Sequence, residues 1–251
     1  MSSIRPSFFG FLVVLVVGEA AAALPDEIQV YTDDLEARGE VGVELHVNTT
    51  PSGRSTPTYP GEVTPYHGLR VTPEISTGLA PGWDAGIYLP FVRNAEGTNY
   101  FAGVKLRLKW LPLKPEEGAS GWFAGINGEI AFVDKRFEES GRSAELRPIV
   151  GYRGGGWLVS FNPILEASLA EPQKGVVSFA PALKLSRSIG DRAALGVEYY
   201  ADLGRLSNFD SPSEQSHTLF AVLDTPWLNF GIGRGLNAAT DRWTVKAIVS
   251  F

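Results

Sequence analysis

The segment Trp243-Thr244-Val245-Lys246-Ala247-Ile248-Val249-Ser250-Phe251 alternates between apolar and mainly polar side chains. Successive side chains of a β-strand point to opposite faces, so one face would carry Trp243, Val245, Ala247, Val249 and Phe251. The opposite face would carry Thr244, Lys246 and Ser250, with Ile248 as its one apolar member. A strand of this kind predicts a sheet with one face in apolar and one face in polar surroundings.

The same period of two recurs along most of the chain. Counting the terminal segment, about twelve stretches of roughly ten residues alternate in this way, which is the length that a tilted strand needs to cross a bilayer. The stretch from His217 to Leu223 is apolar on both faces and cannot be oriented. The twelve stretches cover residues 41–48, 69–77, 83–91, 100–110, 122–132, 145–152, 159–169, 177–186, 195–203, 217–223, 228–233 and 243–251.

A final strand that ends in an aromatic residue resembles the C-terminus of bacterial outer-membrane β-barrel proteins. The resemblance implies an all-β fold, a closed antiparallel transmembrane β-barrel of about 12 strands in the cell outer membrane. It also implies that Phe251 is an assembly signal, read by the barrel-assembly machinery. Outer-membrane lipid would then be a second partner.

The N-terminus agrees with export. One positive side chain, Arg5, precedes the apolar run Phe8–Val17, and the small residues Ala20–Ala23 follow. This order is typical of a secretory signal peptide, and the run is too short for a membrane-spanning helix. We therefore expect a signal peptide over residues 1–23, a periplasmic lead segment over 24–39 and the barrel over 40–251.

Composition excludes several classes of function. The chain has no Cys, so it has neither disulfides nor thiolate metal ligands. Its net charge of −6 argues against nucleic acid as a partner. The three histidines, His46, His67 and His217, lack clustered ligand spacing, so we expect no metal and no cofactor.

Loop lengths and tryptophans orient the barrel. Connections at residues 80–82, 154–156, 189–191 and 224–226 are short, whereas those that alternate with them are long, as expected for periplasmic turns and external loops. One periplasmic connection, residues 112–121, is longer than this pattern predicts. An aromatic belt at the periplasmic interface would consist of Trp83, Trp110, Trp122, Trp157 and Trp227.

Proline is the main objection to this fold. Proline cannot donate to a strand ladder, and a closed barrel has no edge to receive it. We therefore expect bulges or irregular pairing at Pro73, Pro148, Pro163 and Pro181.

The predicted inner face is rich in ionisable groups. Its densest feature is the triplet Lys105, Arg107 and Lys109 on one strand, with Asp84 and Glu129 on the neighbouring strands. Such a set can fill a narrow lumen with ion pairs, or it can guide an anionic solute. The other lumen-lining candidates are Glu44, His46, Arg70, Glu74, Arg147 and Glu198.

Three functions stay open at this point. The first is passive, porin-like passage of a small polar or anionic solute. The second is a closed structural or surface-binding barrel that makes contact through its long first loop, residues 49–67, and this contact would be lost on removal of residues 52–62. The third is a membrane-embedded lipid hydrolase based on His46 or His217, although no catalytic Ser–His pair can be assigned and an enzyme is the less favoured reading.

Overall fold

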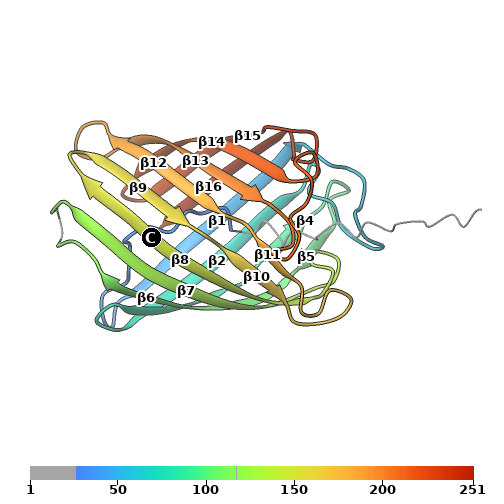
Figure 1. Ribbon diagram of the computed structural model, residues 1–251, viewed down its shortest axis with the longest axis horizontal. Helices are drawn as coiled ribbons and strands as arrows, with labels where there is room; N and C mark the ends of the chain where they lie inside the picture. The colour runs from blue at the N-terminus through green and yellow to red at the C-terminus, as the bar shows by residue number, and fades with distance from the viewer. Residues whose placement is uncertain (1–26, 117) are drawn as a thin grey trace, which may run out of the picture.

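The computed structural model describes residues 27–116 and 118–251 (Figure 1), so the expected signal peptide lies outside the described residues. Sixteen β-segments form a single sheet. They are β1 (Val41–Ser52), β2 (Leu69–Ala80), β3 (Trp83–Tyr88), β4 (Phe91–Arg93), β5 (Asn99–Phe101), β6 (Gly103–Leu113), β7 (Gly121–Val133), β8 (Arg142–Gly154), β9 (Trp157–Asn162), β10 (Leu165–Ser168), β11 (Val177–Phe179), β12 (Ala182–Ser188), β13 (Ala194–Asp202), β14 (Ser216–Thr225), β15 (Leu228–Gly235) and β16 (Trp243–Ser250).

The sheet closes into a barrel because β1 pairs antiparallel with both β2 and β16. Four of the barrel strands are interrupted. The segments β3 and β4 both pair with β2, and β9 and β10 both pair with β8, so each pair is one strand with a break. The pairs β5–β6 and β11–β12 are broken in the same way. The sixteen segments therefore form twelve antiparallel strands, which confirms the predicted fold.

The breaks follow the prolines. Pro163 and Pro181 lie between β9 and β10 and between β11 and β12, which confirms irregular pairing at these two sites. Pro73 and Pro148 lie inside continuous strands without a bulge at either proline, but the pairing on one side of each is interrupted, as predicted. Their effect falls on the neighbour: Pro73 is opposite the break at Leu89, and Pro148 is opposite Pro163. A missing N–H interrupts the ladder on one side only, because each strand residue bonds to one neighbour.

The alternation separates the two faces of the wall. On β6, Leu106, Leu108 and Trp110 are exposed on the outer face, whereas Lys105, Arg107 and Lys109 are buried inside. On β14, which the sequence could not orient, Phe220 and Val222 are buried in the interior. An apolar outer face and a polar interior are typical of a transmembrane β-barrel.

The two ends of the barrel differ. Short turns join the strands at one end, and long loops gather at the other (Figure 1). Trp83, Trp122 and Trp157 stand at the short-turn ends of β3, β7 and β9, and Trp110 stacks on Trp83 with ring centroids 5.4 Å apart. Within the described residues, no helix is long and apolar enough to cross a membrane.

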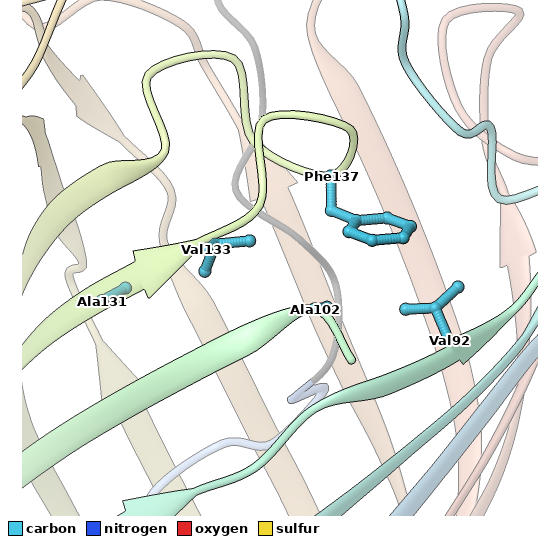
Figure 2. Packing of buried hydrophobic residues seen from close by; sticks show 5 residues of the cluster. All are labelled: Val92, Ala102, Ala131, Val133 and Phe137. Carbon is cyan, nitrogen blue, oxygen red and sulfur yellow. The ribbon is translucent and has the colours of Figure 1, made fainter. Parts of the chain in front are cut away.

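Apolar packing holds loops in place at the long-loop end of the barrel. Phe137, from the loop after β7, packs with Val92, Ala102, Ala131 and Val133 (Figure 2). The first loop joins this cluster, because the N–H of Val63 donates to the carbonyl of Arg136 at 2.8 Å. On the opposite side of the first loop, the N–H of Arg54 donates to Asp241 at 2.8 Å. The first loop thus bridges the mouth between the β7–β8 and β15–β16 connections.

Candidate functional site

Residues 27–39, which we name the lumen segment, run through the barrel toward its short-turn end (Figure 1), where residues 37–39 are exposed. Val30, Tyr31, Thr32 and Asp33 are buried. The backbone of Tyr31 donates to Asn162 Oδ1 at 2.7 Å and accepts from Ser160 Oγ at 2.5 Å, both on β9. We expected a periplasmic lead over this stretch, whereas Val30 to Asp33 lie in the lumen.

The Tyr31 side chain reaches two further strands of the wall, β3 and β7. Its hydroxyl lies 2.7 Å from the hydroxyl of Tyr88 on β3 and 3.3 Å from Glu129 Oε1 on β7. Lys109 and Arg147 lie over its ring, 5.2 and 4.4 Å from the centroid. A ring held by hydrogen bonds and two cations ties the lumen segment to the wall of the barrel.

The cationic triplet is engaged by carboxylates. The Nε of Arg107 donates to Glu74 at 2.6 Å, and its Nη1 makes a short hydrogen bond to Asp84. Lys109 lies 3.4 Å from Asp84, whereas Lys105 lines the cavity described below. These contacts place Arg107 and Lys109 in a packed network and leave little of their charge for a passing solute.

Two more ion-pair groups fill other parts of the interior. Glu198 binds Lys184 at 3.0 Å and also makes a short contact with Lys246, whose ammonium donates to the carbonyl of Ile28 at 2.7 Å. Arg147 binds Glu145 at 2.7 Å and donates to the carbonyl of Gln29 at 3.1 Å. Buried charges of this kind need their partners, since an unpaired one is strongly unfavourable.

Above the lumen segment lies a cavity of about 1310 Å³ that extends to the external loops. Its floor includes Glu27, Ile28 and Gln29, and Arg70 and Glu129 contribute to its wall. The lining includes nine carboxylates and six cationic side chains. The carboxylates belong to Glu27, Glu62, Glu129, Glu145, Glu166, Asp202, Asp210, Glu214 and Asp241, and the cations to Arg54, Arg70, Lys105, Arg147, Arg234 and Arg242.

The first loop carries its own ion pair at the mouth. Arg54 donates to both oxygens of Glu62, at 2.8 and 2.6 Å, and the N–H of Thr58 donates to the same carboxylate at 2.5 Å. Burial raises the pKa of Glu62, but these hydrogen bonds outweigh burial and hold the pKa below its ordinary value. The loop is therefore ordered best when Glu62 is ionised.

Within the described residues, His46, His67 and His217 make contacts with groups other than serine hydroxyls. His46 Nε2 lies 3.2 Å from Glu74, and His217 Nδ1 lies 2.7 Å from the Tyr199 hydroxyl. His67 adopts a left-handed backbone with φ of 52° and stacks on Tyr66. Among the described residues no serine hydroxyl is hydrogen-bonded to a histidine, so a nucleophile and base in contact are not found there.

At the C-terminus, the N–H of Phe251 donates to Val43 at 3.0 Å while its side chain is exposed. Recognition of Phe251 by the assembly machinery stays a prediction.

The lumen segment is the feature that could not be predicted from the sequence. Residues 27–39 show no period of two, and the partners of Tyr31 lie 57 to 131 positions away along the chain.

The sequence matches no known family model, and no curated protein is significantly similar. Solved structures are similar in fold. The COG4313 outer membrane channel from Pseudomonas putida F1 superposes with a TM-score of 0.59 at 12% identity, covering 90% of this chain and 100% of its own. KdgM porin gives a TM-score of 0.52 at 9% identity, covering 84% and 99%. The chain thus has the fold of bacterial outer-membrane β-barrels, proteins of the outer membrane, and shares its architecture with a channel and a porin.

Proposed function

We propose that this barrel passes small polar solutes across the outer membrane through a lumen that residues 27–39 narrow. The observation that carries the proposal is the cavity of about 1310 Å³, which extends from the external loops down to Glu27, Ile28 and Gln29. A barrel that served only as a structural anchor has no need for a chamber of this size. The floor of the chamber is held by hydrogen bonds and ion pairs, which can open without breaking the wall.

The charges favour a neutral or cationic solute over an anionic one. The anionic alternative depended on the triplet, but Arg107 and Lys109 bind Glu74 and Asp84. The lining of the cavity carries more carboxylates than cations. Carboxylate-rich linings favour cations in pores, so passage should show a preference for cations.

The test is conductance of the folded full chain in planar bilayers under a KCl gradient. The proposal expects a small conductance with a reversal potential on the cation-selective side. Replacing Glu214 in the lining of the cavity by Gln should shift that potential toward zero, whereas Glu96→Gln in an exposed turn should not. Absence of any conductance, both from the full chain and from a chain whose lumen segment is released, would rule out solute passage.

A closed, surface-binding barrel is the second candidate. It is favoured by the first loop, which spans the mouth between Val63, bonded to Arg136, and Arg54, bonded to Asp241. In that case the cavity would hold a ligand delivered from outside and would not transmit it. A chain lacking residues 52–62 would then lose ligand binding while its conductance stayed at the level of the intact protein.

A further inference from the structure

Three side chains able to ligate a metal meet inside the barrel on β1 and β2. Glu44 and His46 are two residues apart on β1, and Glu74 of β2 lies directly opposite Glu44. His46 Nε2 is 3.2 Å from Oε2 of Glu74 and 3.7 Å from Oε2 of Glu44. Ligand atoms from all three residues lie within 4.8 Å of one another.

The second oxygen of each carboxylate is held by a separate donor. Oε1 of Glu74 accepts from Arg107 Nε at 2.6 Å, and Oε1 of Glu44 accepts from Ser250 Oγ at 2.7 Å. Both Oε2 atoms are left facing His46. Outer donors of this kind orient carboxylate ligands in protein metal sites.

Nε2 of His46 contacts Oε2 of Glu74 at 3.2 Å, and a metal ion bound there would replace the Nε2 proton. His46 is fully buried, and its Nδ1 has no hydrogen-bond partner among the described residues. A donor at Nδ1 would fix the ring proton on Nε2, where it would block a metal. Thr72, opposite His46 in the strand register, has a buried hydroxyl that also lacks a partner, and this makes it a candidate acceptor for an Nδ1 proton.

Local charge also favours a cation. Like charges directly opposite across two strands are unfavourable, and Glu44 and Glu74 form such a pair. Arg107 and Lys109 are shared with Asp84, so Glu44, Glu74 and Asp84 face two permanently charged cations in this network. A divalent ion between the two Oε2 atoms would offset the excess.

We propose that Glu44, His46 and Glu74 form a binding site for a divalent transition-metal ion, of which Zn²⁺ is the probe. One imidazole and two carboxylates are a ligand set that zinc accepts, with a fourth position left for water. Imidazole favours such metals over Mg²⁺ and Ca²⁺. The Glu44 side chain is 27% exposed, which gives an ion access to the site. Sequence spacing did not reveal the site because Glu74 reaches it only through the pairing of β1 with β2.

The test is a Zn²⁺ titration of the folded, chelator-stripped full chain in detergent, in competition with a chromogenic chelator. We expect one Zn²⁺ per chain, and affinity lower by about tenfold or more in His46→Gln and in Glu44→Gln. His217→Gln, which changes a histidine bonded to Tyr199, should bind as the unchanged protein does.

Glu44→Gln keeps a partner for Ser250 at a partly exposed position, so it tests the site even if His46→Gln fails to fold. Substoichiometric binding, or equal affinity in the unchanged protein and a folded Gln variant, would overturn the proposal. The result does not depend on conductance, so metal binding and solute passage can fail separately.

Discussion

Replacement of Tyr31 by Ala should release the lumen segment. The backbone bonds to Asn162 and Ser160 survive the change, but the ring and hydroxyl contacts are lost. Truncation of a buried aromatic ring costs about 3–5 kcal/mol. The hydroxyl contacts to Tyr88 and Glu129 contribute about 1 kcal/mol each, part of which water in the lumen would replace.

A net loss of about 4 kcal/mol raises the population of the displaced segment roughly a thousandfold, since each 1.4 kcal/mol is tenfold. Single-channel recording measures this as the fraction of time spent in a larger conductance state. Tyr31→Phe is the matched control, because it keeps the ring under Lys109 and Arg147 and loses only the hydroxyl. Its larger state should be populated only about tenfold more than in the unchanged chain, for a loss near 1.4 kcal/mol.

If Tyr31→Ala folds into the barrel and conducts as the unchanged chain does, the lumen segment does not limit conductance and the prediction is wrong. The ion-pair groups of the barrel interior would then be the narrowest part of the lumen. A barrel that fails to fold would not be informative, so far-UV circular dichroism and thermal unfolding must accompany the recordings.

Two further predictions concern the wall and the mouth. Leu106→Arg, in the middle of the outer face of β6, should lower the free energy of unfolding in lipid by about 2–4 kcal/mol. Leu113→Arg, at the end of the same strand, should lower it by only about 0–1 kcal/mol. Urea titration of the folded barrel in lipid measures both values. In the first loop, the pKa of Glu62 is depressed, so its ordering effect is present above about pH 4.5 and is lost as the pH falls through the lower folded value. A spin label on Ser55→Cys should therefore become mobile on acidification, and Arg54→Gln should be mobile already at neutral pH.

The wall of the barrel could be predicted because its signal is local. Alternation on each strand separates lipid-facing from inward residues, and this identified the buried triplet on β6 and the exposed tryptophans at the turns. The orientation of the strand around Phe220 could not be predicted, because the sequence does not distinguish an inward-facing aromatic residue from a lipid-facing one. Its orientation depends on the neighbouring strand, where Gly231 and Gly233 leave the space that the Phe220 ring occupies. A Cβ atom at Gly233 would lie 2.5 Å from that ring.

The contents of the lumen could not be predicted, because closure brings together residues that are distant in sequence. Glu198 reaches Lys246 across 48 positions, and Tyr31 reaches Asn162 across 131. A segment that fills a lumen is surrounded by polar walls on all sides, so it needs no period of its own, and residues 27–39 show none. Of two segments with the same composition, one could therefore lie in the periplasm and the other in the lumen. Only the hydrogen-bond partners on the inner face of the barrel distinguish these two locations. For this chain those partners are the hydroxyl of Tyr88 and the amide of Asn162, which is why Tyr31 is the position where the function of the lumen segment can be tested.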